Sequence, residues 1–136
     1  DTQDGHGIKR LQSAGIEVAS ITGRTTALVR RRAANLKIKH LLQGREDKLV
    51  ALKELITELG YELEEVAYVG DDWPDLPAIL ASGLGIAVAN AHSELRTRAD
   101  HVTTLTGGRG AVREVCDLLL HAQDRYSAAL APYLAI

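Results

Sequence analysis

The fold of this chain is decided by the stretch Val66-Ala67-Tyr68-Val69-Gly70-Asp71-Asp72-Trp73-Pro74-Asp75. Its first four residues are apolar or aromatic, which predicts a buried strand that stops at Gly70. Three carboxylates follow it, and carboxylates about 4 Å apart repel each other by roughly 1 kcal/mol in water and about 4 kcal/mol at a protein surface. The cluster therefore favours a hard cation such as Mg²⁺, which takes oxygen ligands. Alternatively, Asp71 and Asp72 cap a turn and Asp75 is the N-cap of the next helix.

Strands and helices alternate on both sides of this stretch. Apolar runs predict strands at 16–21, 38–42, 66–69, 84–89 and, as a short edge strand, 101–104. Apolar residues at helical spacing predict helices at 5–14, from Thr25 to 35, from the cap Asp47 to Gly60, at 76–81, at 93–99 and after Gly110. The tail from 125 to 136 either extends the last helix or docks elsewhere. Alternation with doubly apolar strands predicts an α/β fold in which helices cover both faces of a parallel sheet.

The composition predicts one soluble domain over residues 1–136. The net charge of −2 gives no basic field for nucleic acid, and no apolar run approaches the ~20 residues that a membrane helix needs. The single cysteine, Cys116, excludes an internal disulfide framework and favours the cytoplasm. The chain opens with Asp1 instead of Met, which predicts that an N-terminal segment is not represented.

Polar clusters follow three of the predicted strands. Ligands of open parallel sheets bind beyond the carboxyl ends of the strands, where Thr22-Gly23-Arg24, Lys48 and Asp71-Asp72 are expected. The Thr22 turn has the free amides and the cation that attract an anion, although a simple turn capped by Thr25 has the same residues. Lys48 lies in the first turn of a helix, where a cation costs about 0.3–1 kcal/mol, so its removal is not expected to destabilise the fold. A phosphate there reverses the sign, whereas the alternative is a solvated lysine paired with Glu46 or Asp47.

The remaining candidate residues predict no further chemistry. Cys116 lies on an apolar helix face and is expected in the core. Trp73 lies among the carboxylates and either shields the site or packs, and packing is favoured. The five histidines show no spacing typical of metal ligands: His6, His40, His92, His101 and His121.

These motifs, in this order, resemble motifs two to four of the haloacid dehalogenase superfamily. They are Ser20-Ile21-Thr22-Gly23-Arg24, Gly44-Arg45-Glu46-Asp47-Lys48 and Gly70-Asp71-Asp72-Trp73-Pro74-Asp75. The 3-deoxy-D-manno-octulosonate 8-phosphate phosphatases are also similar at Asp4-Gly5-His6-Gly7-Ile8, at Gly83-Leu84-Gly85-Ile86-Ala87-Val88-Ala89-Asn90-Ala91 and at Gly107-Gly108-Arg109-Gly110-Ala111-Val112-Arg113-Glu114. The resemblance covers nearly the whole chain.

The resemblance implies a Rossmann-like three-layer sandwich without a large cap domain, and a homotetramer. It also implies a Mg²⁺-dependent phosphatase that hydrolyses a sugar-acid phosphate in lipopolysaccharide precursor synthesis. Thr22 and Lys48 are the implied catalytic residues, and Asp71, Asp72 and Asp75 are the implied metal residues. The implied substrate contacts are Asp1, Thr2, Gln3, Asp4, Gly5, Lys9, Thr22, Gly23, Arg24, Arg32 and Lys48.

One departure from the family pattern is large. Family members begin with a strand that ends in Asp-x-Asp, which carries the nucleophile and the acid/base, and a hairpin used for tetramer assembly follows. This chain has neither. The missing strand is expected between the strands that end at Thr22 and Gly70, so the sheet of this chain is expected to have two unpaired edges.

Other classes of protein have similar motifs or the same types of site residue. A nine-carbon sugar-acid phosphatase, or the phosphatase-like domain of sialic acid cytidylyltransferases, resembles the same motifs. A signalling receiver domain also joins Mg²⁺, Asp, Thr and Lys on a parallel sheet, but its acidic pair comes first, whereas Thr22 and Lys48 precede Asp71 here. A non-catalytic assembly domain is the third alternative.

Overall fold

The computed structural model describes residues 2–134 as an α/β fold. The helices are α1 (Thr2–Ser13), α2 (Ala27–Asn35), α3 (Lys48–Leu59), α4 (Leu76–Ala81), α5 (Ser93–Arg98), α6 (Ala111–Ala122) and α7 (Tyr126–Leu134), with short 3₁₀ helices η1 (Leu63–Glu65) and η2 (Trp73–Asp75). The strands are β1 (Ala19–Ile21), β2 (His40–Leu42), β3 (Ala67–Gly70), β4 (Leu84–Ala87) and β5 (His101–Val102).

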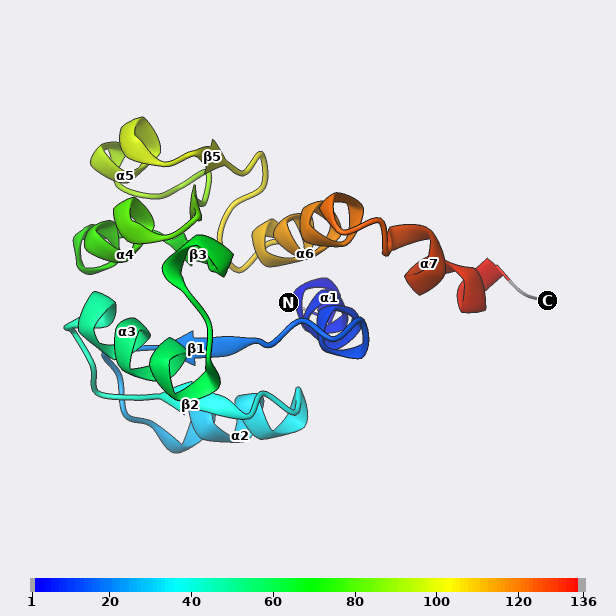
Figure 1. Cartoon of the computed structure of the whole chain (residues 1–136), viewed down its shortest axis with the longest axis horizontal. Coiled ribbons are helices and arrows are strands. Elements are labelled where there is room, and N and C mark those ends of the chain that lie inside the picture. Colours follow the sequence, from blue (N-terminus) through cyan, green and yellow to red (C-terminus); the bar gives the residue numbers. More distant parts are fainter. Residues whose placement is uncertain (1, 135–136) are drawn as a thin grey trace.

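All strand pairs are parallel, as predicted, but the strands form two sheets. One has the order β1-β2 and the other β3-β4-β5, so within residues 2–134 the facing sides of β1 and β3 have no strand partner. Figure 1 shows the strands between α3 and α4 on one side and α1 and α6 on the other. This is the three-layer order that the sequence predicts.

Two apolar clusters hold the layers together. The larger one contains Leu52 of α3, Tyr68 of β3 and Ile79 of α4, and Ile21 of β1 packs against it. The smaller one joins Leu11 of α1 to α6 through Cys116, Leu120 and their neighbours. Because Ile21 belongs to the first sheet, the larger cluster ties the two sheets to each other.

Most element boundaries agree with the patterns, and the exceptions have local causes. Helix α1 begins three residues before the predicted Gly5, and α7 is a separate helix that extends away from the body (Figure 1). Thr26, not Thr25, is the N-cap of α2, because the Thr26 hydroxyl accepts the Val29 amide at 3.1 Å. The Asp47 carboxylate makes no cap hydrogen bond, because it binds Arg45 at 2.8 Å. Gly60 ends α3 in the left-handed region, as predicted.

Candidate functional site

The Thr22 turn lies at the carboxyl end of β1. The Thr22 amide donates to Leu42 of β2, and the Thr22 carbonyl accepts the Arg45 amide at 3.0 Å. The Thr22 hydroxyl oxygen accepts the Arg24 amide at 3.1 Å, which leaves the hydroxyl proton free to donate. These bonds fix the turn from both strands, so that the Thr22 hydroxyl is presented beyond the end of the sheet.

A carboxylate lies against the same turn. A Cβ atom at Gly23 would come within 1.9 Å of the Glu46 Oε1 atom. Because the Glu46 side chain is exposed and flexible, it can swing aside, so the Glu46 carboxylate does not block the turn permanently. An anion at Gly23 displaces a like charge when it binds.

Lys48 is paired, but not with either predicted partner. Its Nζ atom lies 2.9 Å from Asp75 Oδ1, and the two side chains are 16% and 5% exposed. The sequence alternatives, Glu46 and Asp47, are therefore corrected: the partner comes from η2, which α3 contacts. This pair also overturns the expectation that Lys48 can be removed without loss of stability, because a buried carboxylate would lose its counter-charge.

Asp75 accepts four hydrogen bonds. Its Oδ1 atom accepts from Lys48 and from the Tyr68 hydroxyl at 2.7 Å, and its Oδ2 atom accepts the amides of Asp71 at 3.0 Å and Asp72 at 3.3 Å. Burial alone would raise its pKa, but the Asp71 amide, Lys48 and Tyr68 hold the pKa of Asp75 below its ordinary value. Gly70 permits this packing, because a Cβ there would lie 2.4 Å from the Asp75 Cβ.

Tyr68 is the site residue that the sequence analysis missed. It was counted as an apolar strand residue, yet its hydroxyl is the buried donor to Asp75. Burial, followed by the bond to Asp75, raises the pKa of Tyr68 well above its ordinary value, so the hydroxyl keeps its proton. The sequence did contain a signal for this contact, because the hydroxyl of a buried tyrosine usually has a hydrogen-bond partner.

Tyr68→Phe is expected to lower the free energy of unfolding by about 1–2 kcal/mol, because Asp75 loses one of its donors. Urea unfolding monitored by circular dichroism measures this change. Tyr61→Phe is the matched control, since the Tyr61 side chain is 38% exposed, and a change of no more than about 0.5 kcal/mol is expected there. Equal losses in the two variants would contradict a specific role for the Tyr68 hydroxyl.

The three predicted metal carboxylates are not equally free. The side chain of Asp72 accepts the Trp73 amide at 2.8 Å, and Asp75 has the donors described above. Within residues 2–134 no group of three or more His, Cys, Asp and Glu side chains is arranged to hold a metal ion. Asp71 is the exception among the three, because it has no strong donor to its carboxylate.

The electrostatics of Asp71 fit a cation. Burial, followed by the charge of Asp75, raises the pKa of Asp71 above its ordinary value. An uncompensated carboxylate at the end of a strand suits Mg²⁺, which takes one or two protein carboxylates and completes its shell with other oxygens. The donor set of this chain therefore fits one edge of a magnesium site, and Asp71 is the carboxylate of the three that could hold the ion.

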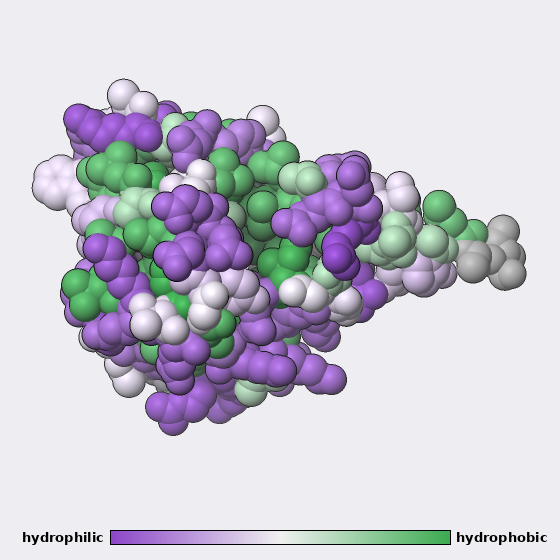
Figure 2. All heavy atoms as spheres, in the orientation of Figure 1, coloured by the Kyte–Doolittle hydropathy of each residue, from purple (hydrophilic) through white to green (hydrophobic). Residues whose placement is uncertain are grey.

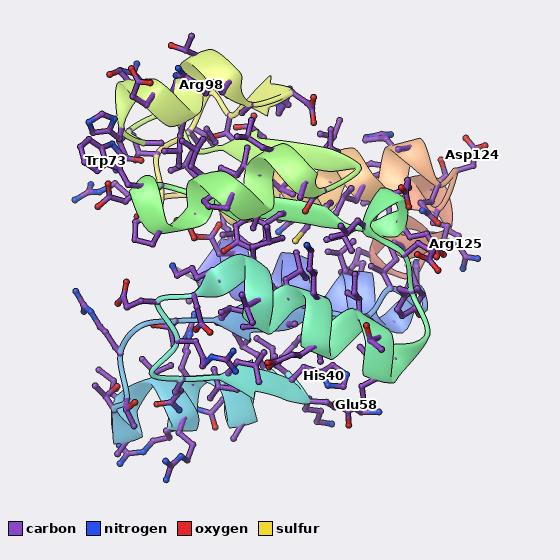
Figure 3. The ribbon with its side chains drawn as sticks, turned by 60° about the vertical axis from the view of Figure 1, so that its left-hand side comes forward. His40, Glu58, Trp73, Arg98, Asp124 and Arg125 are labelled. Carbon is purple, nitrogen blue, oxygen red and sulfur yellow. The ribbon has the colours of Figure 1, made fainter. Side chains whose placement is uncertain are left out.

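Trp73 does not pack as predicted. Trp73 is 63% exposed, and its ring meets the His92 ring edge-on, with 5.2 Å between centroids. Figure 3 shows it projecting from the end of the molecule opposite to Asp124 and Arg125. The His92 amide donates to the Asp71 carbonyl at 2.9 Å, so Trp73 and His92 border the carboxylates.

The described substrate contacts predicted in the N-terminal region belong to α1. Asp4 and Gly5 are buried in α1, where Asp4 Oδ1 accepts the Arg113 amide of α6 at 2.9 Å and Gly5 approaches Leu36. The other described side chains of that set are exposed: Thr2, Gln3, Lys9, Arg24 and Arg32. Asp1 lies outside the described residues.

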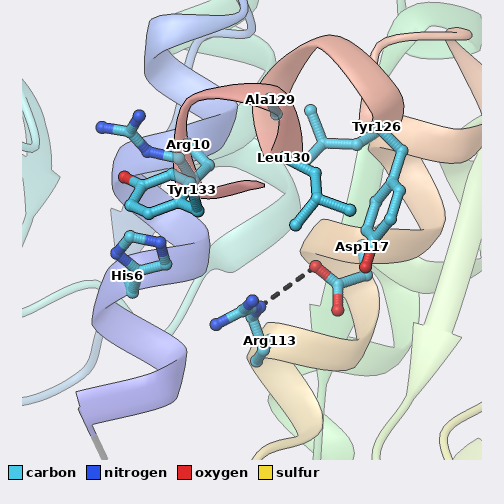
Figure 4. Close-up of a pocket in the computed structure, with 9 residues that line it drawn as sticks. His6, Arg10, Arg113, Asp117, Tyr126, Ala129, Leu130 and Tyr133 are labelled. Atoms are coloured by element: carbon cyan, nitrogen blue, oxygen red, sulfur yellow. Dashed lines mark hydrogen bonds and ion pairs between the residues drawn. The ribbon is translucent and has the colours of Figure 1, made fainter. Parts of the chain in front are cut away.

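A small cavity lies between α1, α6 and α7. It measures about 40 Å³ and is lined by His6, Arg10, Arg113, Asp117 and Tyr133 among others (Figure 4). That volume holds about two or three water molecules, which excludes a sugar-sized ligand. A larger hollow of about 430 Å³ is lined by Lys53, Tyr61 and Glu64 among others, at the end of α3 away from Lys48, so neither hollow includes Thr22, Lys48 or Asp71.

The described residues show no membrane helix. Within residues 2–134, no helix combines the length and the apolar composition that a membrane crossing requires.

Comparison with known proteins agrees with the family resemblance of the motifs. Residues 41–115 match the model of the haloacid dehalogenase-like hydrolases. The chain is 51% identical to the 3-deoxy-D-manno-octulosonate 8-phosphate phosphatase KdsC of Yersinia pestis over 129 residues. This alignment covers 95% of this chain and 69% of that protein.

Solved structures give the same result. The 3-deoxy-D-manno-octulosonate 8-phosphate phosphatase of Moraxella catarrhalis, in complex with magnesium ion, phosphate ion and KDO, is 50% identical with a TM-score of 0.95, over 97% of this chain and 76% of that one. The cobalt-bound deoxy-D-mannose-octulosonate 8-phosphate phosphatase of Haemophilus influenzae is 42% identical with a TM-score of 0.91, over 93% of this chain and 74% of that one.

Proposed function

The chain belongs to the haloacid dehalogenase-like hydrolases, and on that basis we propose that it is the body of a Mg²⁺-dependent phosphatase acting on 3-deoxy-D-manno-octulosonate 8-phosphate. The products are the free sugar acid and inorganic phosphate. The single observation that carries the proposal is the Lys48–Asp75 pair, which holds a cation beside the free carboxylate of Asp71. The relatives named above supply the substrate.

The residues of this chain divide the work of binding the phosphoryl group. Thr22 donates its hydroxyl proton, and the Gly23 amide can approach a second phosphoryl oxygen once Glu46 swings aside. Lys48 neutralises phosphoryl charge, while Asp75 orients its ammonium group. Asp71 holds the Mg²⁺ ion, which when bound stabilises negative charge on the phosphoryl oxygens.

The remaining cations suit the other end of the substrate. A sugar acid has a carboxylate in addition to the phosphate, and Arg24, in the Thr22 turn, and Arg32, in α2, are exposed. We assign these two side chains to the carboxylate, while Thr2, Gln3 and Lys9 extend the substrate surface along α1.

The attacking carboxylate comes from a strand between β1 and β3. This proposal is supported by the free facing edges of those strands, because unpaired edges are a liability in water. Such a strand, ending in Asp-x-Asp, would point its carboxylates at the same edge as Thr22 and Asp71.

The test compares this chain with the same chain extended by an apolar strand that ends in Asp-x-Asp. Mg²⁺-dependent phosphate release from 3-deoxy-D-manno-octulosonate 8-phosphate is expected only from the extended protein. Turnover by residues 1–136 alone, absent from their Asp71→Asn variant, would contradict the division of roles. Preference for a nine-carbon sugar-acid phosphate would correct the substrate.

We also propose that the protein works in the cytoplasm as a homotetramer. The free, buried thiol of Cys116 suits a reducing compartment, and burial raises its pKa to about 12. Light scattering of the extended protein measures the assembly, and a monomeric mass would contradict the tetramer.

A further inference from the structure

Charge is segregated along this chain. From Val18 to Arg45 there are seven Lys and Arg residues and no Asp or Glu. From Glu54 to Leu95 there are nine Asp and Glu residues and no Lys or Arg. The net charge of −2 therefore conceals a strongly basic segment around β1, α2 and β2 and a strongly acidic one around β3, α4 and β4.

The basic segment presents most of its charge on the surface. Arg45 is neutralised by Asp47 and Glu54, at 2.8 and 3.1 Å. The other six cations are exposed, and we call them the basic face: Arg24, Arg30, Arg31, Arg32, Lys37 and Lys39. Figure 2 shows hydrophilic residues along the lower side of the molecule, where Figure 1 places α2.

The basic face begins at the Thr22 turn. The helix α2 starts at the Thr26 cap, and the Thr26 amide donates to Gln43 Oε1 at 2.9 Å, which joins the turns that follow β1 and β2. Arg30 and Arg31 lie about 5 Å along the helix axis from its first residue, whereas Lys37 follows the last helical residue, Asn35, which is about 12 Å along that axis. The positive end of the α2 dipole adds to the same field.

The surroundings of Arg30 and Arg31 show that their charge is available. Within residues 2–134 neither guanidinium makes an ion pair or a hydrogen bond, and the acidic segment lies on other elements. A structural role for Arg30 and Arg31 would require a hydrogen-bond or ion-pair partner, or burial of the aliphatic part of the side chain. These two side chains have neither.

We infer that the basic face captures the anionic substrate and guides it to the Thr22 turn, while the acidic residues of that segment outside the site repel it from other directions: Glu54, Glu58, Glu62, Glu64, Glu65 and Glu94. The inference rests on the proposed function, because a sugar-acid phosphate carries about three negative charges at pH 7. Fields of this kind raise association rates by about 10- to 1,000-fold, and they weaken as salt screens them. Arg30 and Arg31 act through charge and do not touch the bound substrate.

Trp73 provides a measurement that needs no turnover. It is the only tryptophan and is exposed beside Asp72, so its fluorescence reports binding in the presence of Mg²⁺. Stopped-flow experiments with inorganic phosphate and with 3-deoxy-D-manno-octulosonate 8-phosphate then give separate association and dissociation rates.

The decisive variant is Arg30→Gln/Arg31→Gln. In buffer of about 20 mM ionic strength, its association rate with the sugar-acid phosphate is expected to fall about three- to tenfold with an unchanged dissociation rate. The loss should be smaller for inorganic phosphate, which has one charge fewer, and should disappear at about 1 M salt, where the Debye length is about 3 Å. Circular dichroism confirms that the fold is retained.

Two matched variants separate capture from contact. Arg30→Lys/Arg31→Lys keeps the charge and is expected to keep the rate. Lys37→Gln/Lys39→Gln removes the same charge farther from the Thr22 turn. Both double variants are compared at about 0.1 M salt, where the Debye length is about 10 Å, and the lysine positions are expected to lower the rate less than Arg30→Gln/Arg31→Gln does at the same salt.

Several results would overturn the inference. A faster dissociation rate in Arg30→Gln/Arg31→Gln, a loss that persists at high salt, or a loss in the lysine variant would show direct contact. An unchanged association rate would show a solvated surface without a role in capture. Failure of the unaltered chain to bind either ligand with Mg²⁺ would contradict the proposed function, and the capture role with it.

Discussion

Lys48→Ala is expected to impair both the stability of the fold and the chemistry of the site. The free energy of unfolding should fall by about 2–3 kcal/mol, because the buried Asp75 carboxylate loses its only cation while it retains the donors from Tyr68 and two amides. Phosphate release by the extended enzyme should fall by about 10³-fold, because a charge clamp on the phosphoryl group is lost. Urea unfolding and phosphate release measure the two effects.

The two effects of Lys48 are separable. In the variant Lys48→Ala/Asp75→Asn the buried charge is also removed, so more than half of the lost stability is expected to return, while activity stays low. Lys53→Ala, an exposed lysine on the same helix, is the matched control and should change neither quantity. Near-normal turnover in a Lys48→Ala protein of reduced stability would show that this lysine is structural.

Asp71→Asn is expected to abolish Mg²⁺ binding, with at least about a 100-fold loss of affinity. The reason is that Asp71 is the carboxylate of the cluster without a strong protein donor, so the metal depends on it. Calorimetric titration with Mg²⁺ measures the affinity. Asp72→Asn is the control, and it should retain most of the binding because its side chain serves the Trp73 amide.

The same substitution should stabilise the metal-free protein. The pKa of Asp71 is raised in the folded state, so its charged form opposes folding above the ordinary carboxyl range, and that penalty is relieved as the pH falls through the folded-state pKa. Asparagine removes the penalty at neutral pH, so the melting temperature of Asp71→Asn should exceed that of the parent without Mg²⁺. Added Mg²⁺ should raise only the parent's melting temperature, and an equal rise in both proteins would place the metal elsewhere.

Local patterns predicted most of the fold. Helix α4 has the predicted bounds, Gly60 ends α3, and Gly70 ends β3, because each depends on residues within a few positions of one another. Strand lengths and the choice between Thr25 and Thr26 were less well predicted, since boundaries depend on a single hydrogen bond. The split of the sheet was predicted from the resemblance, because members of the family have a further strand between those that end at Thr22 and Gly70.

The hydrogen-bond and ion-pair partners of the site side chains could not be predicted from the sequence. Asp75 was expected to support a metal, yet its oxygens are taken by Tyr68, which is seven residues away, and by Lys48, which is 27 residues away. A carboxylate cluster signals a need for positive charge without saying whether an ammonium or a metal supplies it. Trp73 was expected to pack because tryptophan usually does, yet it is 63% exposed.

The contact between Asp4 and Arg113 has a consequence for synthesis on the ribosome. It joins residues 109 positions apart, and the apolar side of α1, with Leu11, is covered only when α6 arrives. At about 5–20 residues per second, α1 waits about 5–20 s in the growing chain before its partner helix emerges. During that interval Leu11 and its neighbours lack the apolar cover that α6 provides, so this side of α1 is a surface that chaperones can bind.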